Sequence, residues 1–145
     1  MSFAVDVNVL LSASNPACKE HKAARAFLER SIAGDEIVCV AWATLMSYLR
    51  IATHAGIFPA PLTPQEARAN VVGLLGLPNV RALSEGDGFW ESYEEVTRGV
   101  VVRGNLVADA HLVAVLHQSG VRVLYSNDAD FRLFPLIELR DPLAA

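Results

Sequence analysis

The sequence has little cysteine, little lysine and no long apolar run. Its only cysteines, Cys18 and Cys39, show neither CxxC spacing nor a matching histidine cluster, which indicates reduced thiols rather than a zinc site or a disulfide framework. No stretch approaches the ~20 apolar residues that span a bilayer. The N-terminus has no basic segment before its short apolar run, so no signal peptide is expected. These features predict a cytoplasmic protein without a membrane span.

The charge balance is mildly acidic. Of 12 basic residues only Lys19 and Lys22 are lysines, and 16 acidic residues bring the net charge to −4, which argues against the broad basic face of many nucleic-acid binders. The motif GxxxxGK is absent, which excludes a P-loop. The 145 residues, 52% of them hydrophobic, predict one domain over residues 1–145 with a sizeable core. Because this apolar content exceeds the usual ~45–50%, we also expect a partner surface, including a homodimer.

Segments typical of strands alternate with segments typical of helices. The expected strands are 2–5, 37–40, 79–83, 121–125 and 136–139, and the expected helices are 20–32, 41–53, one starting at 63–66, one around 90–96, and 105–119. Thr63 and Glu66 form a capping-box pattern, and Asn105 is an expected N-cap. The alternation predicts an α/β fold whose largely parallel sheet has helices on both faces. Functional residues of such sheets gather beyond the carboxyl ends of the strands.

Acidic residues occupy these strand ends. Asp6 follows the first expected strand, Asp128 and Asp130 follow the strand at 121–125, and Asp109 lies near the start of a helix. Taken singly, each fits a helix cap or a turn. Together at one sheet edge they would repel one another unless a hard cation such as Mg²⁺ or Mn²⁺ neutralised them. Such an ion lowers the pKa of a bound water and stabilises developing negative charge, which predicts phosphodiester hydrolysis.

Three blocks carry a resemblance to a known family: Asp6-Val7-Asn8-Val9-Leu10-Leu11, Gly104-Asn105-Leu106-Val107-Ala108-Asp109-Ala110 and Ser126-Asn127-Asp128-Ala129-Asp130-Phe131. In order and spacing they resemble the signature blocks of PIN-domain proteins, most closely VapC-type toxins of type II toxin–antitoxin (VapBC) systems. Residues 42–54 and 131–143 are similar too, so the resemblance spans essentially the whole chain. It implies a three-layer α/β/α sandwich with a mainly parallel sheet.

The resemblance also implies an activity. The implied protein is a Mg²⁺-dependent endoribonuclease that cleaves structured cellular RNA and thereby inhibits translation and growth. Mn²⁺ would be an alternative ion. A cognate VapB-type antitoxin would neutralise the enzyme by laying its C-terminal segment across the active site. On matching positions, the resemblance makes Asp6, Asp109 and Asp128 metal ligands and Asp130 a further acid. Asn8 would orient the Asp6 carboxylate by hydrogen bonding, and Ser126 would do the same near the last acids, Asp128 and Asp130.

Ser47 departs from the family pattern, which usually has a glutamate three residues before Arg50. A hydroxyl is a poor substitute for a carboxylate, and no acid occurs between Glu36 and Glu66 to replace it. A second metal is therefore in doubt. Arg50 itself has two interpretations: a bidentate contact to a phosphate or an antitoxin carboxylate, or a structural ion pair.

Two alternative functions remain. One is a PIN-like binding module of weakened activity, with Ser47 as its sign. The other is a phosphoryl-transfer enzyme or receiver domain. Haloacid-dehalogenase-type phosphatases need an aspartate where Asn8 stands, and both groups need a downstream lysine, whereas the only lysines are Lys19 and Lys22.

The histidines and aromatic residues suggest structural roles. No HxH or HxxxH spacing occurs; we expect His117 to be structural and His111, two residues from Asp109, to point elsewhere on its helix. Trp42, Trp90 and Tyr93 are interpreted as core or interface aromatics, with base stacking as the alternative.

Overall fold

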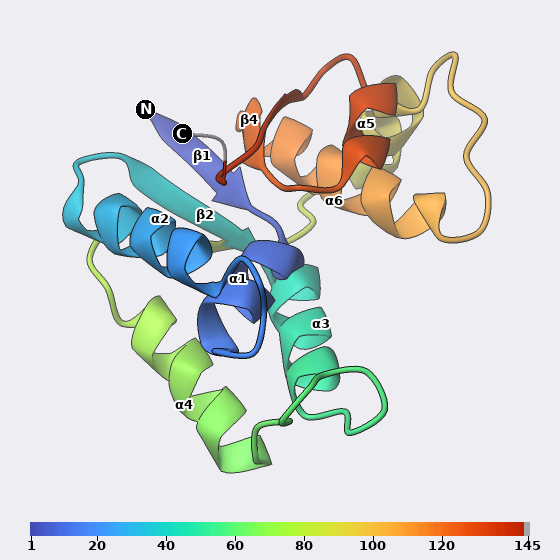
Figure 1. Ribbon diagram of the computed structural model, residues 1–145. Coiled ribbons are helices and arrows are strands. Elements are labelled where there is room, and N and C mark those ends of the chain that lie inside the picture. Colours follow the sequence, from blue (N-terminus) through green and yellow to red (C-terminus); the bar gives the residue numbers. More distant parts are fainter. Residues whose placement is uncertain (144–145) are drawn as a thin grey trace.

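The computed structural model describes residues 1–143 as alternating strands and helices (Figure 1). The strands are β1 (Ser2–Val5), β2 (Ile37–Ala41), β3 (Val80–Leu83), β4 (Val123–Tyr125) and β5 (Glu138–Arg140). The helices are α1 (Val7–Ser14), α2 (His21–Ala33), α3 (Trp42–Ala52), α4 (Pro64–Leu75), α5 (Phe89–Val96) and α6 (Leu106–Gln118), with the 3₁₀ helix η1 (Ala129–Leu133) between β4 and β5. None of these helices is long and apolar enough to span a membrane.

The strands form one five-stranded sheet in the order β3-β2-β1-β4-β5, and every neighbouring pair is parallel. The first strand lies in the middle, with Ala4 level with Cys39 on one side and Leu124 on the other. A central strand of a parallel sheet is covered on both faces, which explains why β1 is a continuous apolar run rather than an alternating one. All carboxyl ends share one edge of the sheet, where Asp6 leaves β1.

Helices cover both faces of the sheet, as predicted. Successive side chains of a strand point to opposite faces, so Phe3 and Val5 pack with α1 to α4, whereas Ala4 packs with α5 and α6. Figure 1 shows α1, α2, α3 and α4 on one side of the strands and α5 and α6 on the other. The α/β/α sandwich with a parallel sheet is therefore confirmed.

Local capping agrees with the sequence in one place and differs in another. The Thr63 hydroxyl accepts a hydrogen bond from the Glu66 amide (3.1 Å), and the Glu66 carboxylate accepts one from the Thr63 amide (3.0 Å), so the capping box is confirmed. Asn105 occupies the N-cap of α6 but makes no side-chain capping bond. Its backbone is already helical (φ −62°, ψ −22°), whereas a capping side chain normally accompanies an extended backbone.

Other differences concern α1, α3 and the aromatic residues. The sequence did not predict α1, which begins directly after Asp6, and α3 ends at Ala52, a residue before the expected end. Trp42 and Trp90 are 44% and 61% exposed, so they are surface residues rather than core ones. Both cysteines are free, as expected.

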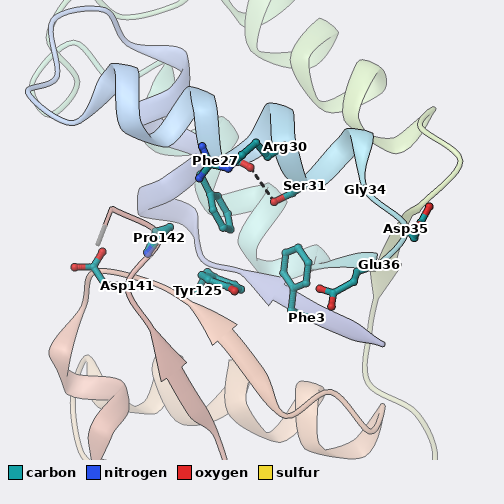
Figure 2. Close-up of a pocket in the computed structure, with 10 residues that line it drawn as sticks. All are labelled: Phe3, Phe27, Arg30, Ser31, Gly34, Asp35, Glu36, Tyr125, Asp141 and Pro142. Atoms are coloured by element: carbon teal, nitrogen blue, oxygen red, sulfur yellow. Dashed lines mark hydrogen bonds between the residues drawn. The ribbon is translucent and has the colours of Figure 1, made fainter. Parts of the chain in front are cut away.

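A cavity of about 390 Å³ lies on the α2 side of the sheet. Figure 2 shows the residues that line it. Three rings meet there: the ring centroids of Phe27 and Tyr125 are 4.7 Å apart, and those of Phe3 and Tyr125 are 5.1 Å apart. Its rim carries charges of both signs, from Arg30, Asp35, Glu36 and Asp141. None of the four acids predicted to form a metal site lines this cavity.

Candidate metal centre

Two of the predicted acids, Asp6 and Asp128, are placed by capping interactions. Asp6 is the N-cap of α1, and its Oδ1 accepts a 2.8 Å hydrogen bond from the amide of Val7. Asp128 is the N-cap of η1, and its Oδ1 accepts a 3.0 Å bond from the amide of Asp130. Asp109 lies in the first turn of α6. Because each of these caps uses one carboxylate oxygen, it fixes the position of the carboxylate and leaves the second oxygen for other contacts.

Three of these acids converge. Asp109, Asp128 and Asp130 each offer a carboxylate oxygen, and these oxygens lie within 4.8 Å of one another. Asp6 does not belong to this trio, but it lines the same cleft as Asp109, and its negative charge contributes to raising the pKa of Asp109. A cluster of carboxylate oxygens on this scale suits a hard divalent cation.

A buried polar network holds Asp6. The Ser126 hydroxyl donates a 2.8 Å hydrogen bond to Asp6 Oδ2. Ser126 Oγ in turn accepts bonds from Asn8 Nδ2 (3.1 Å) and from the amide of Asp128 (3.0 Å). Asn8 Nδ2 also lies 3.4 Å from Asp6 Oδ2. One serine hydroxyl therefore connects the segment after β1 with the segment after β4.

The amide oxygen of Asn8 is buried and has no hydrogen-bond partner among residues 1–143. A buried acceptor without a donor is unfavourable by about 1–3 kcal/mol. Water molecules in the coordination sphere of a divalent cation are donors, and Mg²⁺ usually keeps several of them. The polar atoms beside the acid cluster therefore fit a hydrated divalent cation.

The electrostatics of the acids favour a cation as well. Burial raises the pKa of Asp109 to about 6, and the charges of Asp128, Asp6 and Asp130 act in the same direction. Burial also raises the pKa of Asp6, while its bonds from Ser126 and Val7 oppose that shift. Like charges in a partly desolvated site destabilise one another's ionised forms, and a bound cation reverses that effect.

A cleft of about 230 Å³ opens between α3 and α6 beside the acids. Asp6 and Asp109 line it, together with Ser47 and Arg50 from α3. Arg50 is exposed and makes no ion pair with any residue of the described chain, 1–143. Its guanidinium is available to a ligand in the cleft.

His111 lies in the same cleft, which the sequence analysis missed. Asp109 and His111 are about 160° apart around an ideal helix, and the stripe of Ala108 and Leu112 lies between them. Since that stripe also lines the cleft, the two side chains flank it from opposite sides. We expected the spacing of two residues to separate His111 from Asp109 on different surfaces of the helix. Instead, the two side chains lie on opposite walls of the same cleft.

Glu85 is the second residue that was missed. Its carboxylate accepts a short hydrogen bond from Nε2 of His111. Glu85 comes two residues after β3 and thus follows the carboxyl end of a strand, as Asp6 does. This position after a strand end was a feature of the sequence from which Glu85 could have been identified as a candidate site residue. The other expected structural histidine, His117, pairs with Glu95 on α5 at 3.3 Å and does not line the cleft.

A parallel sheet with acids converging beyond its carboxyl ends, next to a cleft that Arg50 lines, defines an α/β domain with an acidic cluster that could hold a divalent cation for phosphate chemistry. Comparison with known proteins identifies the family within this class. Residues 3–135 match the PIN domain, and the chain belongs to the PIN-domain family.

The similar proteins include VapC ribonucleases and VapBC complexes. The chain is 41% identical to Ribonuclease VapC48 of Mycobacterium tuberculosis over 144 residues, which cover 99% of both chains. Among solved structures it resembles VapBC2 from Rickettsia felis, bound to a promoter DNA fragment, with a TM-score of 0.69, 13% identity and coverage of 97% and 98% of the two chains. It also resembles VapC20 of Mycobacterium tuberculosis, a toxin that cleaves the sarcin–ricin loop, with a TM-score of 0.63, 18% identity and coverage of 94% and 98%.

Proposed function

We propose that this chain is a Mg²⁺-dependent endoribonuclease toxin that cleaves cellular RNA, inhibits translation and growth, and is neutralised by a cognate antitoxin. The observation that carries the proposal is the convergence of Asp109, Asp128 and Asp130 beside Asp6. The full-length similarity to Ribonuclease VapC48 supports RNA as the substrate.

Asp6, Asp109 and Asp128 would hold the ion, directly or through water, with Asp130 as a further acid at its exposed side. When bound, Mg²⁺ or Mn²⁺ lowers the pKa of a water molecule and offsets the charge that develops on the phosphate. Ser126 and Asn8 keep the Asp6 carboxylate in one orientation through the hydrogen bonds described above. These residues are preorganised, so little rearrangement accompanies the reaction.

Arg50 is placed to bind the RNA backbone. Its planar guanidinium matches two phosphate oxygens, and it lies in the cleft that Asp6 and Asp109 also line. The cation at the acids would turn the locally negative edge into a phosphate-binding one. A net charge of −4 is therefore compatible with a nucleic-acid substrate.

The proposed antitoxin is a VapB-type protein. Two similar solved structures, from Rickettsia felis and Salmonella typhimurium, are of VapBC proteins bound to DNA, which supports a partner of this kind. A groove of about 260 Å³ between α1, α3 and α4, lined mainly by apolar residues including Leu10, Leu45 and Leu74, offers an apolar surface for it. The exposed Trp42 and Met46 of α3 support a further interface, for which a homodimer is the proposed occupant.

The second candidate function is a PIN-fold binding module with little or no activity. Ser47 favours it, because a hydroxyl lines the cleft where the family usually has a carboxylate. This candidate shares the fold and the partner surfaces with the toxin. It differs in predicting no metal-dependent RNA cleavage.

Purified chain, freed of any antitoxin, incubated with total RNA in Mg²⁺, Mn²⁺ or EDTA, separates the two candidates. We expect discrete cuts in Mg²⁺ and Mn²⁺, none in EDTA, and none with Asp6→Asn. Sequencing of the new ends identifies the RNA and the cut site. If the folded wild-type chain cuts no RNA with either ion, the nuclease proposal is wrong and the binding module remains.

A further inference from the structure

The wall of the cleft opposite Asp109 carries a histidine–carboxylate pair that the metal centre does not use. His111 lines the cleft, and its Nε2 contacts the carboxylate of Glu85, which comes from the loop after β3. About a third of the His111 side chain is exposed, so the ring is accessible to a ligand.

The ring is held from two sides. Phe89, the first residue of α5, packs edge-on against it, with centroids 5.5 Å apart and an interplanar angle of 83°. Glu85 holds the ring through Nε2. A ring held by both packing and a hydrogen bond loses little further freedom when it binds a ligand.

The loop that carries Glu85 is itself tied to α6. The amide of Gly86 donates a 2.9 Å hydrogen bond to Oε1 of Gln118, and Nε2 of Gln118 donates a 2.7 Å bond to the carbonyl of Asp87. Gln118 lies two helical turns beyond His111 and so on the same side of α6. The loop therefore contacts α6 at two separate points, which fixes Glu85 relative to the cleft.

The hydrogen-bond roles of the two ring nitrogens follow from this arrangement. Glu85 is half exposed, and such a carboxylate is ionised at neutral pH and can only accept. Nε2 therefore carries the hydrogen, and in the neutral imidazole Nδ1 is an acceptor. Nδ1 has no hydrogen-bond partner within the described part of the chain.

An acceptor in the cleft needs a donor on the substrate. The phosphates of RNA and DNA offer acceptors only, whereas each ribose adds a 2′-hydroxyl, which can donate. Metal-assisted hydrolysis itself does not use the 2′-hydroxyl. A nuclease of this chemistry that distinguishes RNA from DNA therefore needs a contact to that group elsewhere in its site.

We propose that Nδ1 of His111 accepts a hydrogen bond from a ribose 2′-hydroxyl of the bound RNA, and that Glu85 is the positioning residue that orients the ring for it. The inference rests on the proposed ribonuclease function and names the feature by which the same cleft distinguishes RNA from DNA. Asp109 and its neighbours act at the phosphodiester, and His111 acts at a sugar across the cleft.

The test is a double-mutant cycle that combines a substitution in the enzyme with a modification of the substrate. An RNA oligonucleotide spanning the main cut site mapped on total RNA is synthesised with a single 2′-deoxy substitution at each nucleotide around that site. We expect one position at which the substitution lowers the kcat/KM of the wild type by about 3- to 10-fold, the size of one lost hydrogen bond. His111→Phe, which keeps the ring and its contact with Phe89, should lower kcat/KM on the all-ribose RNA by a similar factor. It should show no further loss at that position.

Three further variants test whether Glu85 acts by orienting the His111 ring. Glu85→Gln keeps an acceptor for Nε2 and should stay within about 2-fold of the wild type, whereas Glu85→Ala should lose most of the discrimination at the same nucleotide. His117→Phe is the matched control, because His117 also pairs with a glutamate but lies outside the cleft. It should leave the 2′-deoxy penalty unchanged.

Independent penalties for His111→Phe and the 2′-deoxy substitution, in variants that fold normally by circular dichroism, would overturn the role of His111 while leaving the ribonuclease intact. A wild type insensitive to every 2′-deoxy position would overturn it too. Absence of RNA cleavage by the wild type would overturn the proposed function and this inference together.

Discussion

The hydroxyl of Ser126 donates a 2.8 Å hydrogen bond to Asp6 across 120 positions of sequence. The two residues end neighbouring strands of the sheet, β4 and β1, and both side chains are almost completely buried. A hydrogen bond to a buried carboxylate is among the stronger ones in a protein. This bond therefore fixes the first acid of the centre relative to the segment that carries Asp128 and Asp130.

Replacing Ser126 by alanine tests that bond. We expect Ser126→Ala to lower the free energy of unfolding by about 1–3 kcal/mol, because a buried carboxylate oxygen loses its donor. The pKa of Asp6 should rise further, since the Ser126 bond opposes the effect of burial. Urea unfolding measures the first effect. Ser92→Ala, on the partly exposed α5, is the control; equal stability of the two variants would contradict the prediction.

Asp109→Asn should lower RNA cleavage by about two orders of magnitude or more while the protein stays folded, because the change removes a charged ligand but keeps the shape of the side chain. Initial rates in Mg²⁺ and circular dichroism measure the two effects. Asp87→Asn, in the loop after β3 and outside the cluster, is the control and should cleave normally. Cleavage by Asp109→Asn at the wild-type rate would exclude Asp109 from the centre.

Ser47→Glu should restore the carboxylate that the family usually has at this position. Without metal, the added charge in the cleft of Asp6 and Asp109 should lower the melting temperature. With metal, the affinity for Mg²⁺ or Mn²⁺ should rise by roughly tenfold, because an additional charged ligand is present. Ser47→Gln, of the same size but uncharged, should show neither effect. Equal metal affinity in the two variants would refute the prediction.

Stability without metal should depend on pH through Asp109. Its pKa of about 6 lies above the ordinary value of 3.8, so the folded protein binds this proton more tightly than the unfolded chain does. The resulting stabilisation is fully present below pH 3.8 and is lost as the pH rises through 6. In EDTA we therefore expect a higher melting temperature at pH 5 than at pH 7.5.

Two comparisons isolate the cause of this pH dependence. Saturating Mg²⁺ should raise the melting temperature mainly at pH 7.5, where the carboxylates are ionised. Asp109→Asn in EDTA should be more stable than the wild type at pH 7.5, and the difference should shrink towards pH 5. Calorimetry at several pH values measures both. A wild type whose stability falls from pH 7.5 to pH 5 in EDTA would contradict the assignment.

Part of this architecture could be predicted from short-range patterns. A four-residue apolar run that ends at Asp6 indicates a central parallel strand and places an acid at its carboxyl end. The same reasoning placed Asp128 after β4. Thr63 and Glu66 specify a helix start by themselves, because both halves of the capping box lie within one turn.

Other features depend on contacts that no local pattern contains. The segment of α1 holds the β-branched Val7 and Val9 directly after a strand, so its composition does not distinguish a helix from a continuing strand. The pair of Glu85 and His111 joins residues 26 positions apart, and only the packing of the loop after β3 on α6 brings them together. The exposure of Trp90 likewise follows from which face α5 turns to the core.

The central place of β1 has a consequence for how the protein is made. During synthesis, β1 can pair with β2 soon after both have emerged, but its other neighbour, β4, is synthesised more than a hundred residues after β1. Asp6 can therefore meet Asp128 only after the chain as far as β4 and η1 has emerged. A growing chain thus contains Asp6 long before the acidic cluster can assemble, so the proposed activity would be absent from partly synthesised chains that end before η1.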